Sequence, residues 1–278
     1  MRFLSLVVLV LIFAGALSLP AEEMRYPVGE KLEYRAYALG FIPIGDVWVD
    51  ISTGVYNGVP TYQFNGRCLG DYKIYVADVR LTSHIDAQSD RSVYHYIEQY
   101  GSERRGRRLL FDWNKNQVDY IRREKDGSYA FRRSTPVTPD VFDVFASGLQ
   151  ARHHFSTDIG TTNDVKLIEK DRVYHLKCTA VEEKYIDIPE VGVFKAARVT
   201  FQAVNLSKDE IFKGLLDLDK DIELWIDTST KTPLVFITSV PFGFVRPKVS
   251  VVLKKWHTIP GFEPVLYSRD VIKAQAKK

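Results

Sequence analysis

Arginines and aromatic residues are interleaved in one stretch of the sequence, residues 103–133. This stretch holds ten Lys and Arg against five Asp and Glu, so its local net charge is +5 (10 − 5). A guanidinium binds a carboxylate or phosphate through two parallel hydrogen bonds and also stacks on aromatic rings. Because paired strands bring such side chains together, we expect a surface for an anionic lipid headgroup, an anionic glycan or an acidic envelope protein. The expected binding residues are Arg104, Arg105, Arg107, Arg108, Trp113, Arg122 and Arg123.

A structural interpretation of the same stretch stays open, because charged side chains on an edge strand keep sheets from pairing with one another. Nucleic acid would use the same combination of arginines and stacked rings. The whole 278-residue chain, however, has a formal net charge of only +3, which excludes a strongly basic nucleic-acid binder. We therefore expect no nucleic-acid partner.

Signatures of catalysis are missing from the sequence. It has no nucleophile-elbow serine motif, no zinc-protease motif, no phosphate-binding loop and no dinucleotide fingerprint. The spacing of His84, Asp86 and His95 allows an acid–base or metal cluster on a strand face, with ordinary surface positions as the alternative. Residues 217–221 resemble the start of a calcium loop, but its sixth and twelfth positions carry the wrong residues. We expect no catalytic residues, no metal and no cofactor.

The amino terminus has the pattern of a cleaved signal peptide. Arg2 precedes an apolar run over residues 3–17, and small residues for a signal peptidase follow, up to Ala21. The run is short for a bilayer span, which needs about 20 residues. The sequence predicts export to the periplasm, where the chain is soluble after cleavage and has no transmembrane segment, with an uncleaved anchor as the alternative.

The two cysteines, Cys68 and Cys178, both lie in strand-like sequence. In an exported chain an even number of cysteines favours a disulfide. A disulfide between Cys68 and Cys178 would close a long loop, which would stabilise the fold by about 4–5 kcal/mol in the chain-entropy description. Two separately buried free thiols are the alternative.

Hydrophobic and polar residues alternate with period two along much of the chain, as in half-buried antiparallel strands. The clearest runs are residues 31–36, 46–51, 93–98, 199–203 and 222–226. Turn-forming pairs, among them Asn57-Gly58, Asn65-Gly66 and Asp126-Gly127, occur between or beside such runs. The sequence predicts a mainly β fold, a large curved antiparallel sheet that is either an open barrel or sandwich-like.

One segment interrupts this alternation and predicts a central amphipathic helix over residues 139–153. Thr138 supplies a hydroxyl cap, and Pro139 suits the first position of a helix. Apolar residues then follow helical spacing as far as Leu149, and cations suit the carboxyl end of the helix dipole. We expect this helix to lie across one face of the sheet.

No internal repeat or low-complexity linker divides the chain, and 45% hydrophobic residues are enough for a sizeable core. We expect a signal peptide at residues 1–21, a single β-rich domain at 22–262 and a polar, frayed tail at 263–278.

Several groups of residues, in their order and spacing, resemble the DUF3108 family of exported bacterial proteins of unknown function. They are residues 27–34 and 40–47, the segment 138–152 with Asp143 and Ser147, residues 188–194 and residues 224–235. The resemblance implies export, a single β-rich domain and no established activity, and it supplies no catalytic residues. We therefore expect a non-catalytic periplasmic binding or envelope-biogenesis accessory protein that holds an apolar or anionic lipid or glycan ligand. The alternatives are an envelope hydrolase acting on glycan or peptide and a structural assembly partner of an envelope complex.

Overall fold

The computed structural model describes residues 26–72, 75–205, 222–239 and 248–276. The strands are β1 (Lys31–Ala38), β2 (Ile42–Tyr56), β3 (Val59–Tyr72), β4 (Tyr75–Asp86), β5 (Ser92–Gly101), β6 (Arg105–Asp112), β7 (Gln117–Arg123), β8 (Tyr129–Pro136), β9 (Val141–Asp143), β10 (Thr162–Glu169), β11 (Arg172–Ile188), β12 (Gly192–Asn205), β13 (Glu223–Asp227), β14 (Pro233–Ser239), β15 (Lys248–His257) and β16 (Leu266–Tyr267). The helices are α2 (Val144–His154) and α3 (Asp270–Gln275). The predicted signal peptide and residues 217–221 lie outside the described residues. Within these ranges, no helix has the length and hydrophobicity needed to cross a membrane.

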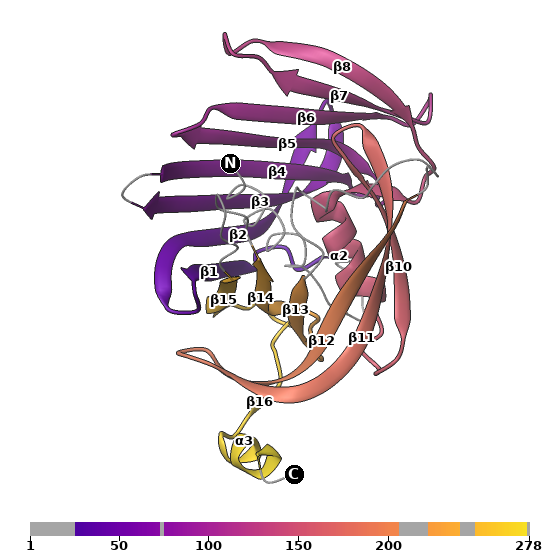
Figure 1. Cartoon of the computed structure of the whole chain (residues 1–278). Helices are drawn as coiled ribbons and strands as arrows, with labels where there is room; N and C mark the ends of the chain where they lie inside the picture. The colour runs from indigo at the N-terminus through magenta and orange to yellow at the C-terminus, as the bar shows by residue number, and fades with distance from the viewer. Residues whose placement is uncertain (1–25, 73–74, 206–221, 240–247, 277–278) are drawn as a thin grey trace.

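All of these strands belong to one 16-stranded sheet. Its order is β8-β7-β6-β5-β4-β3-β2-β1-β15-β14-β13-β12-β11-β10-β9, and β16 pairs with β12 beside this path. Neighbouring strands are antiparallel except for β9 and β10, which are parallel. The sheet curves around α2 and stays open, because β8 and β9 at its two ends do not pair with each other (Figure 1). The prediction of a mainly β fold with a large curved sheet is confirmed. Of the two predicted forms, the open barrel and the sandwich, the sheet takes the open one.

The predicted alternation of residues places the core on the concave side of the sheet. In β1, Leu32, Tyr34 and Ala36 are at most 1% exposed, while the residues between them face away from the core. The predicted turn at Asn57 and Gly58 joins β2 to β3, with φ angles of 49° and 82°. This pair of left-handed residues matches the strand twist in a two-residue hairpin.

Helix α2 fills the concave side of the sheet and begins later than the sequence predicts. Asp143, not Thr138, is the N-cap, and its carboxylate accepts hydrogen bonds from the backbone N–H groups of Phe145 and Ala146. The preceding residues form β9, because they pair in parallel with β10 instead of continuing the helix. The predicted start at residue 139 is therefore wrong. The polar side of the helix is narrow and carries Gln150, His153 and His154, because the curved sheet covers the rest.

The two ends of the sheet are joined by side chains where backbone pairing is missing. A second hydrophobic cluster spans β6, β7, β9 and β10, and it consists of Leu109, Phe111, Val118, Val137, Val141 and Ile168. Beside it, Arg107 Nη1 lies 2.6 Å from Glu169 Oε1 at the end of β10. Thr135 Oγ1 of β8 donates to the backbone carbonyl of Asp171 at 3.0 Å. These contacts hold the open seam together without a continuous ladder of backbone hydrogen bonds.

The two cysteines are both free and buried in this structure. Cys68 lies on β3 and Cys178 on β11, and the six strands β2, β1, β15, β14, β13 and β12 separate them along the sheet. The predicted disulfide is therefore not formed, and two separately buried thiols describe the chain. Burial raises the pKa of both thiols well above the usual value.

The chain after residue 263 is more ordered than the sequence predicts. β16 pairs with β12, and Gln275 of α3 accepts a hydrogen bond from the backbone N–H of Tyr185 at 2.8 Å. Arg269 Nε lies 3.0 Å from Asp187 Oδ2. The expectation of a frayed tail is wrong for these residues, because β11 and β12 extend far enough to bind them.

Candidate functional site

A buried cluster of serine, histidine and aspartate lies at the amino end of α2. Ser83 Oγ and Ser92 Oγ donate to Asp143 Oδ2 at 2.6 and 2.8 Å, and His95 Nδ1 lies 3.7 Å from Asp143 Oδ1. Burial lowers the pKa of His95 to about 4, although Asp143 opposes this shift. All four side chains are at most 2% exposed. Because Asp143 caps α2 and also accepts hydrogen bonds from both serines, the buried cluster holds the start of the helix against β4 and β5.

The structure does not bring together the three residues predicted as an acid–base or metal cluster. His95 faces the core, whereas His84 faces outward, where its ring lies 5.2 Å from that of Tyr56. Asp86 caps a turn by accepting the backbone N–H of Gln88 at 2.7 Å. His95 pairs with Ser83 on the inner side of the sheet, whereas His84 pairs with Tyr94 on the outer side, so the pleat separates the two histidines.

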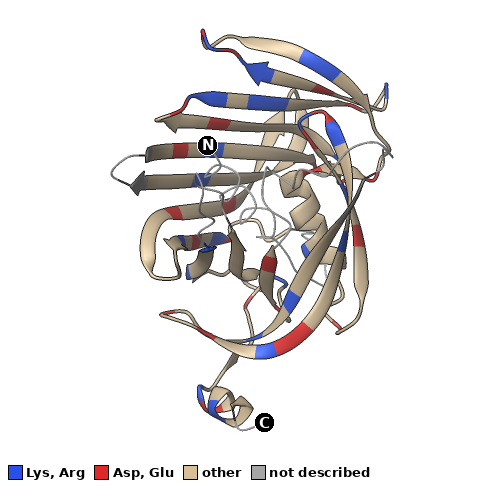
Figure 2. Ribbon diagram, viewed as in Figure 1, with Lys and Arg blue, Asp and Glu red and all other residues tan. Residues whose placement is uncertain are grey.

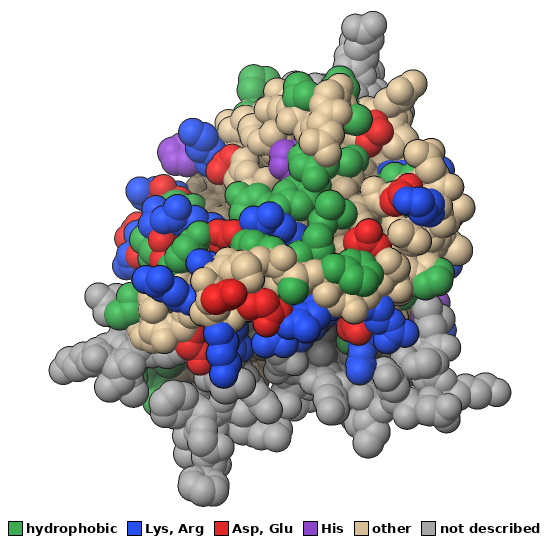
Figure 3. Space-filling view, turned by 90° about the horizontal axis from the view of Figure 1, so that it is seen from above, with side chains coloured by type: hydrophobic (Ala, Val, Ile, Leu, Met, Phe, Trp, Pro, Cys, Tyr) green, Lys and Arg blue, Asp and Glu red, His purple; other side chains and the backbone are tan. Residues whose placement is uncertain are grey.

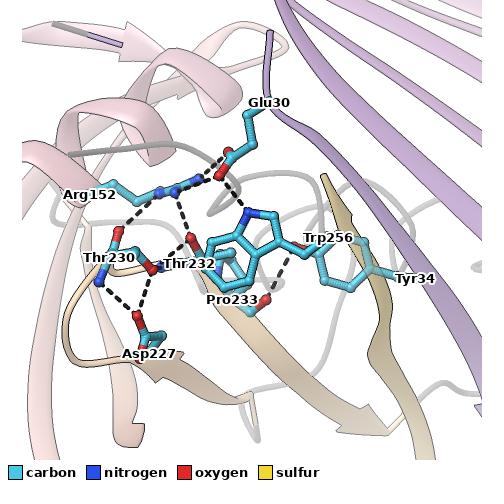
Figure 4. A network of polar contacts seen from close by, with 8 residues as sticks. All are labelled: Glu30, Tyr34, Arg152, Asp227, Thr230, Thr232, Pro233 and Trp256. Carbon is cyan, nitrogen blue, oxygen red and sulfur yellow. Dashed lines mark hydrogen bonds and ion pairs between the residues drawn. The ribbon is translucent and has the colours of Figure 1, made fainter. Parts of the chain in front are cut away.

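A second buried network holds the other end of the helix (Figure 4). Arg152 and Glu30 are each 1% exposed, and Arg152 Nη1 donates to Glu30 Oε2 at 3.0 Å. Arg152 Nη2 also donates to Thr232 Oγ1 at 2.5 Å, and Trp256 Nε1 donates to Glu30 Oε1 at 2.9 Å. Burial lowers the pKa of Arg152, while Glu30 favours its charged form. The network ties α2 to the start of β1, the β13–β14 turn and β15.

A half-open cleft of about 470 Å³ lies beside the carboxyl half of α2, against β10 and β11. Its charged side chains pair with one another: His175 Nε2 is 2.7 Å from Asp164 Oδ1, and Lys166 Nζ is 2.6 Å from Asp140 Oδ2. Apolar side chains, among them Phe142, Ala151 and Phe155, line the same cleft beside these charged pairs. In the described ranges, no three His, Cys, Asp or Glu side chains are arranged to hold a metal ion.

The outer side of β4–β8 carries a continuous array of tyrosines and arginines. We call it the tyrosine–arginine face, and it consists of Arg80, Tyr94, Tyr96, Glu98, Tyr100, Arg108, Arg123 and Tyr129. Figure 2 shows basic residues on each of β6, β7 and β8. Figure 3, seen from the β8 side of the molecule, shows hydrophobic side chains, tyrosine included, in a band with charged groups on both sides.

Glu98 organises this face. Tyr129 Oη donates to Glu98 Oε1 at 2.5 Å, and Tyr100 Oη donates to the other carboxylate oxygen. To reach Glu98, Tyr129 crosses Gly106, where a Cβ atom would lie 2.5 Å from its hydroxyl oxygen. The guanidinium of Arg108 then stacks 3.7 Å from the centre of the Tyr129 ring. These contacts fix the rings of Tyr100 and Tyr129 and the guanidinium of Arg108 in place.

Two arginines of this face have no carboxylate of a described residue within hydrogen-bond distance. Arg108 Nη2 is 3.7 Å from Glu98 Oε1, beyond hydrogen-bond distance, and Arg123 forms no ion pair with a described residue. Arg80, in contrast, is held by Asp78 at 2.9 Å. The face can thus offer Arg108 and Arg123 to an anion.

Comparison with known proteins places the chain in a family. A family model described as a protein of unknown function (DUF3108) matches residues 33–249. The chain belongs to the DUF3108 family. No curated protein matches this DUF3108 chain.

Two solved structures are similar to the DUF3108 chain at 9% sequence identity. One is a β-barrel-like protein of a domain of unknown function, DUF1849, from Brucella abortus, with a TM-score of 0.47 and coverage of 84% of this chain and 98% of that chain. The other is a putative exported protein with a YmcC-like fold from Bacteroides fragilis, with a TM-score of 0.28 and coverage of 83% and 96%. At this level of similarity, neither structure says anything about a ligand of the DUF3108 chain.

The pleat of the sheet divides the predicted basic residues of the DUF3108 protein between its two sides. Arg108 and Arg123 lie on the tyrosine–arginine face. The inner side carries Arg105, Arg107 and Arg122. Arg105 pairs with Gln99 and Arg107 pairs with Ile97, and both partners face the core. Arg122 pairs with Arg107 and therefore lies on the same side.

The two remaining predicted residues lie apart from this face. Arg104 is exposed in the β5–β6 turn. Trp113 packs beside the second hydrophobic cluster and donates from Nε1 to the carbonyl of Ser92 at 2.8 Å. The stretch is therefore not one patch.

Sequence reasoning missed Glu98 and the tyrosines of β5 as site residues. Their signal was present, because Tyr94, Tyr96, Glu98 and Tyr100 occupy alternate positions of one strand. It also missed the two buried networks that hold the ends of α2. Three of the acids involved, Glu30, Asp143 and Asp227, fall within segments that carry the family resemblance. Glu30 and Asp143 are buried and position the helix, and Asp227 supports the β13–β14 turn by accepting from Thr230 N at 2.7 Å.

Proposed function

We propose that this DUF3108 protein is a non-catalytic binding protein of the cell envelope, exported to the periplasm, that recognises an anionic glycan through its tyrosine–arginine face. The availability of Arg108 and Arg123 beside fixed tyrosine rings carries the proposal. The signal-peptide pattern at residues 1–21 supports export.

The chemistry of the face favours a glycan with carboxylate or phosphate groups. Arginine forms paired hydrogen bonds with both anions. The stacked rings of Tyr56 and Tyr94, 4.7 Å apart, continue the array along β5 and offer flat apolar surfaces to sugar rings. A sheet face suits an extended chain better than a compact small molecule, which needs a concave pocket.

The buried clusters support a function without bond-making. The serines near His95 donate to Asp143, and all of these groups lie out of reach of a substrate. A general acid or base must come within hydrogen-bond distance of its substrate. The two networks at the ends of α2 are explained by their role in holding the helix.

The test measures binding of the mature chain to polygalacturonate, which carries carboxylates, and to a phosphomannan, with neutral dextran as the reference. Arg108→Gln together with Arg123→Gln should weaken binding at least about tenfold, since a hydrogen bond to a charged group contributes about 1.5–3 kcal/mol. Added salt should weaken the remaining binding.

The matched control is the double variant Arg105→Gln with Arg122→Gln, which removes the same charge from the other side of the same strands. It should bind nearly as well as the unchanged chain. Equal losses in the two double variants, or no binding of either acidic polysaccharide by the unchanged chain, would show that the face does not recognise an anionic glycan.

A further inference from the structure

Two strand connections and the start of β4 lie at one end of the sheet, and apolar side chains project from it. The registers of the strand pairs from β1 to β6 place the β1–β2 turn, the start of β4 and the β5–β6 turn there, on the left of Figure 1. Leu39, Phe41 and Val76 of this end are 56%, 72% and 47% exposed. We call these three residues the apolar tip.

The turn that carries the tip has an unusual residue for its backbone. Leu39 and Gly40 have φ angles of 54° and 81°, nearly the same as Asn57 and Gly58 in the β2–β3 turn. The left-handed conformation favours Gly, Asn or Asp and is unfavourable for leucine. Of the seven non-glycine residues with positive φ in the described part of the chain, Leu39 alone is hydrophobic. Neither the turn nor the core explains an exposed leucine at this position.

Two exposed basic residues lie next in the fold to the segments that carry the apolar tip. Lys248 is exposed, and its carbonyl accepts the backbone N–H of Leu39 at 2.8 Å. Arg104 is exposed in the β5–β6 turn and forms no ion pair with a described residue. Glu103, an acid of the same turn, is held by Arg105 at 3.0 Å. The described charges around the tip therefore favour an anionic partner.

We propose that this end of the molecule docks on an anionic lipid bilayer, with the apolar tip in the headgroup–acyl boundary. Apolar side chains that enter this boundary and cations that meet anionic headgroups are the two contributions that hold peripheral proteins on membranes. Gly40 has no atom within 4 Å of where its Cβ would lie, so the turn projects freely enough to enter the boundary. The proposal is independent of glycan binding, because the tip and the tyrosine–arginine face involve different residues.

The test is co-sedimentation of the mature chain with vesicles of phosphatidylcholine, with and without phosphatidylglycerol. The chain should bind the anionic vesicles more tightly. Leu39→Asn with Phe41→Ser should weaken this binding at least about tenfold, because two exposed apolar side chains are lost. Leu39→Asn alone should also raise the denaturant midpoint of unfolding, since asparagine suits the left-handed turn, so a folding defect cannot explain the lost binding.

The matched control is Val55→Ser, because Val55 is 66% exposed at the opposite end of β2. It should leave vesicle binding unchanged. In a second measurement, the emission of Phe41→Trp should shift to shorter wavelength with anionic vesicles, whereas that of Val55→Trp should not.

Several results would overturn the docking proposal. One is that the unchanged chain does not bind anionic vesicles. Another is that the tip variant and the Val55 variant lose vesicle binding equally. A third is that the emission of Phe41→Trp keeps its wavelength when the protein is bound to vesicles. Loss of vesicle binding in the Arg108→Gln, Arg123→Gln variant with the tip variant unaffected would instead assign lipid to the tyrosine–arginine face. If the tip bound an acidic peptide and did not bind vesicles, the partner would be a protein and the proposal of bilayer docking would be refuted.

Discussion

Removing the charge of Arg152 tests how the helix is held. Arg152→Met keeps the length of the side chain but leaves Glu30, which is 1% exposed, with Trp256 Nε1 as its remaining donor in Figure 4. An uncompensated buried charge costs about 3–5 kcal/mol. Since a domain of this kind is stable by about 5–15 kcal/mol, the variant should lose a large share of its stability.

The double variant Arg152→Met with Glu30→Gln separates the ion pair from simple loss of packing. Without Arg152, the neutral amide introduced by Glu30→Gln is far cheaper to bury than the carboxylate, so the double variant should be more stable than Arg152→Met by about 2 kcal/mol or more. The measurement is guanidinium unfolding at pH 7, followed by tryptophan fluorescence and far-UV circular dichroism, which should give coincident transitions.

The control is Arg35→Met, because Arg35 forms an ion pair with Asp46 at 2.8 Å in which the two side chains are 35% and 31% exposed. It should cost at most about 1 kcal/mol. If Arg152→Met costs no more than Arg35→Met, or if Glu30→Gln adds its full destabilisation to that of Arg152→Met, the buried pair does not hold the helix as argued.

Two further predictions concern buried titratable groups. Because burial lowers the pKa of His95 to about 4 from 6.5, the unfolded chain binds the additional proton as the pH falls from about 6.5 towards 4, and stability should fall in this window by up to about 1.4 kcal/mol per pH unit. His95→Gln should flatten the measured dependence of the unfolding free energy on pH, and an unchanged slope would mean that His95 is not buried in its neutral form. Cys68 and Cys178 should not react with a thiol reagent at pH 8 in the folded chain, and two thiols per chain should react once it is unfolded; fewer than two would reveal the disulfide.

The strands were predictable because alternation is a local property. The runs at residues 31–36 and 46–51 became β1 and β2 with the expected residues in the core. The pair Asn65-Gly66 was misread as a turn, because it lies within β3, where the Asn65 amide donates to Asp50 Oδ2 at 3.0 Å. A pair that often forms a turn stays extended when the strands on both sides supply hydrogen-bond partners for its backbone.

The candidate site was only half predictable for a related reason. The sequence correctly marks residues 103–133 as rich in arginine, but it cannot say which arginines meet, because the side of each strand depends on register and bulges. Arg107 and Arg108 are neighbours in sequence. One is bound to Glu169 on the inner side, and the other stacks on Tyr129 on the outer side.

By itself, the sequence determined the mainly β class, most strands, the existence of a central helix and the family, because period-two alternation and short ordered motifs depend on neighbouring residues. Only the tertiary structure decided where the helix begins, which charges are buried and which arginines remain available. Arg152 meets Glu30 across 122 positions of sequence, and Ser92 meets Asp143 across 51. Such contacts depend on how the sheet curves, and the free energy of burying a charge is set by that enclosure and not by the adjacent residues.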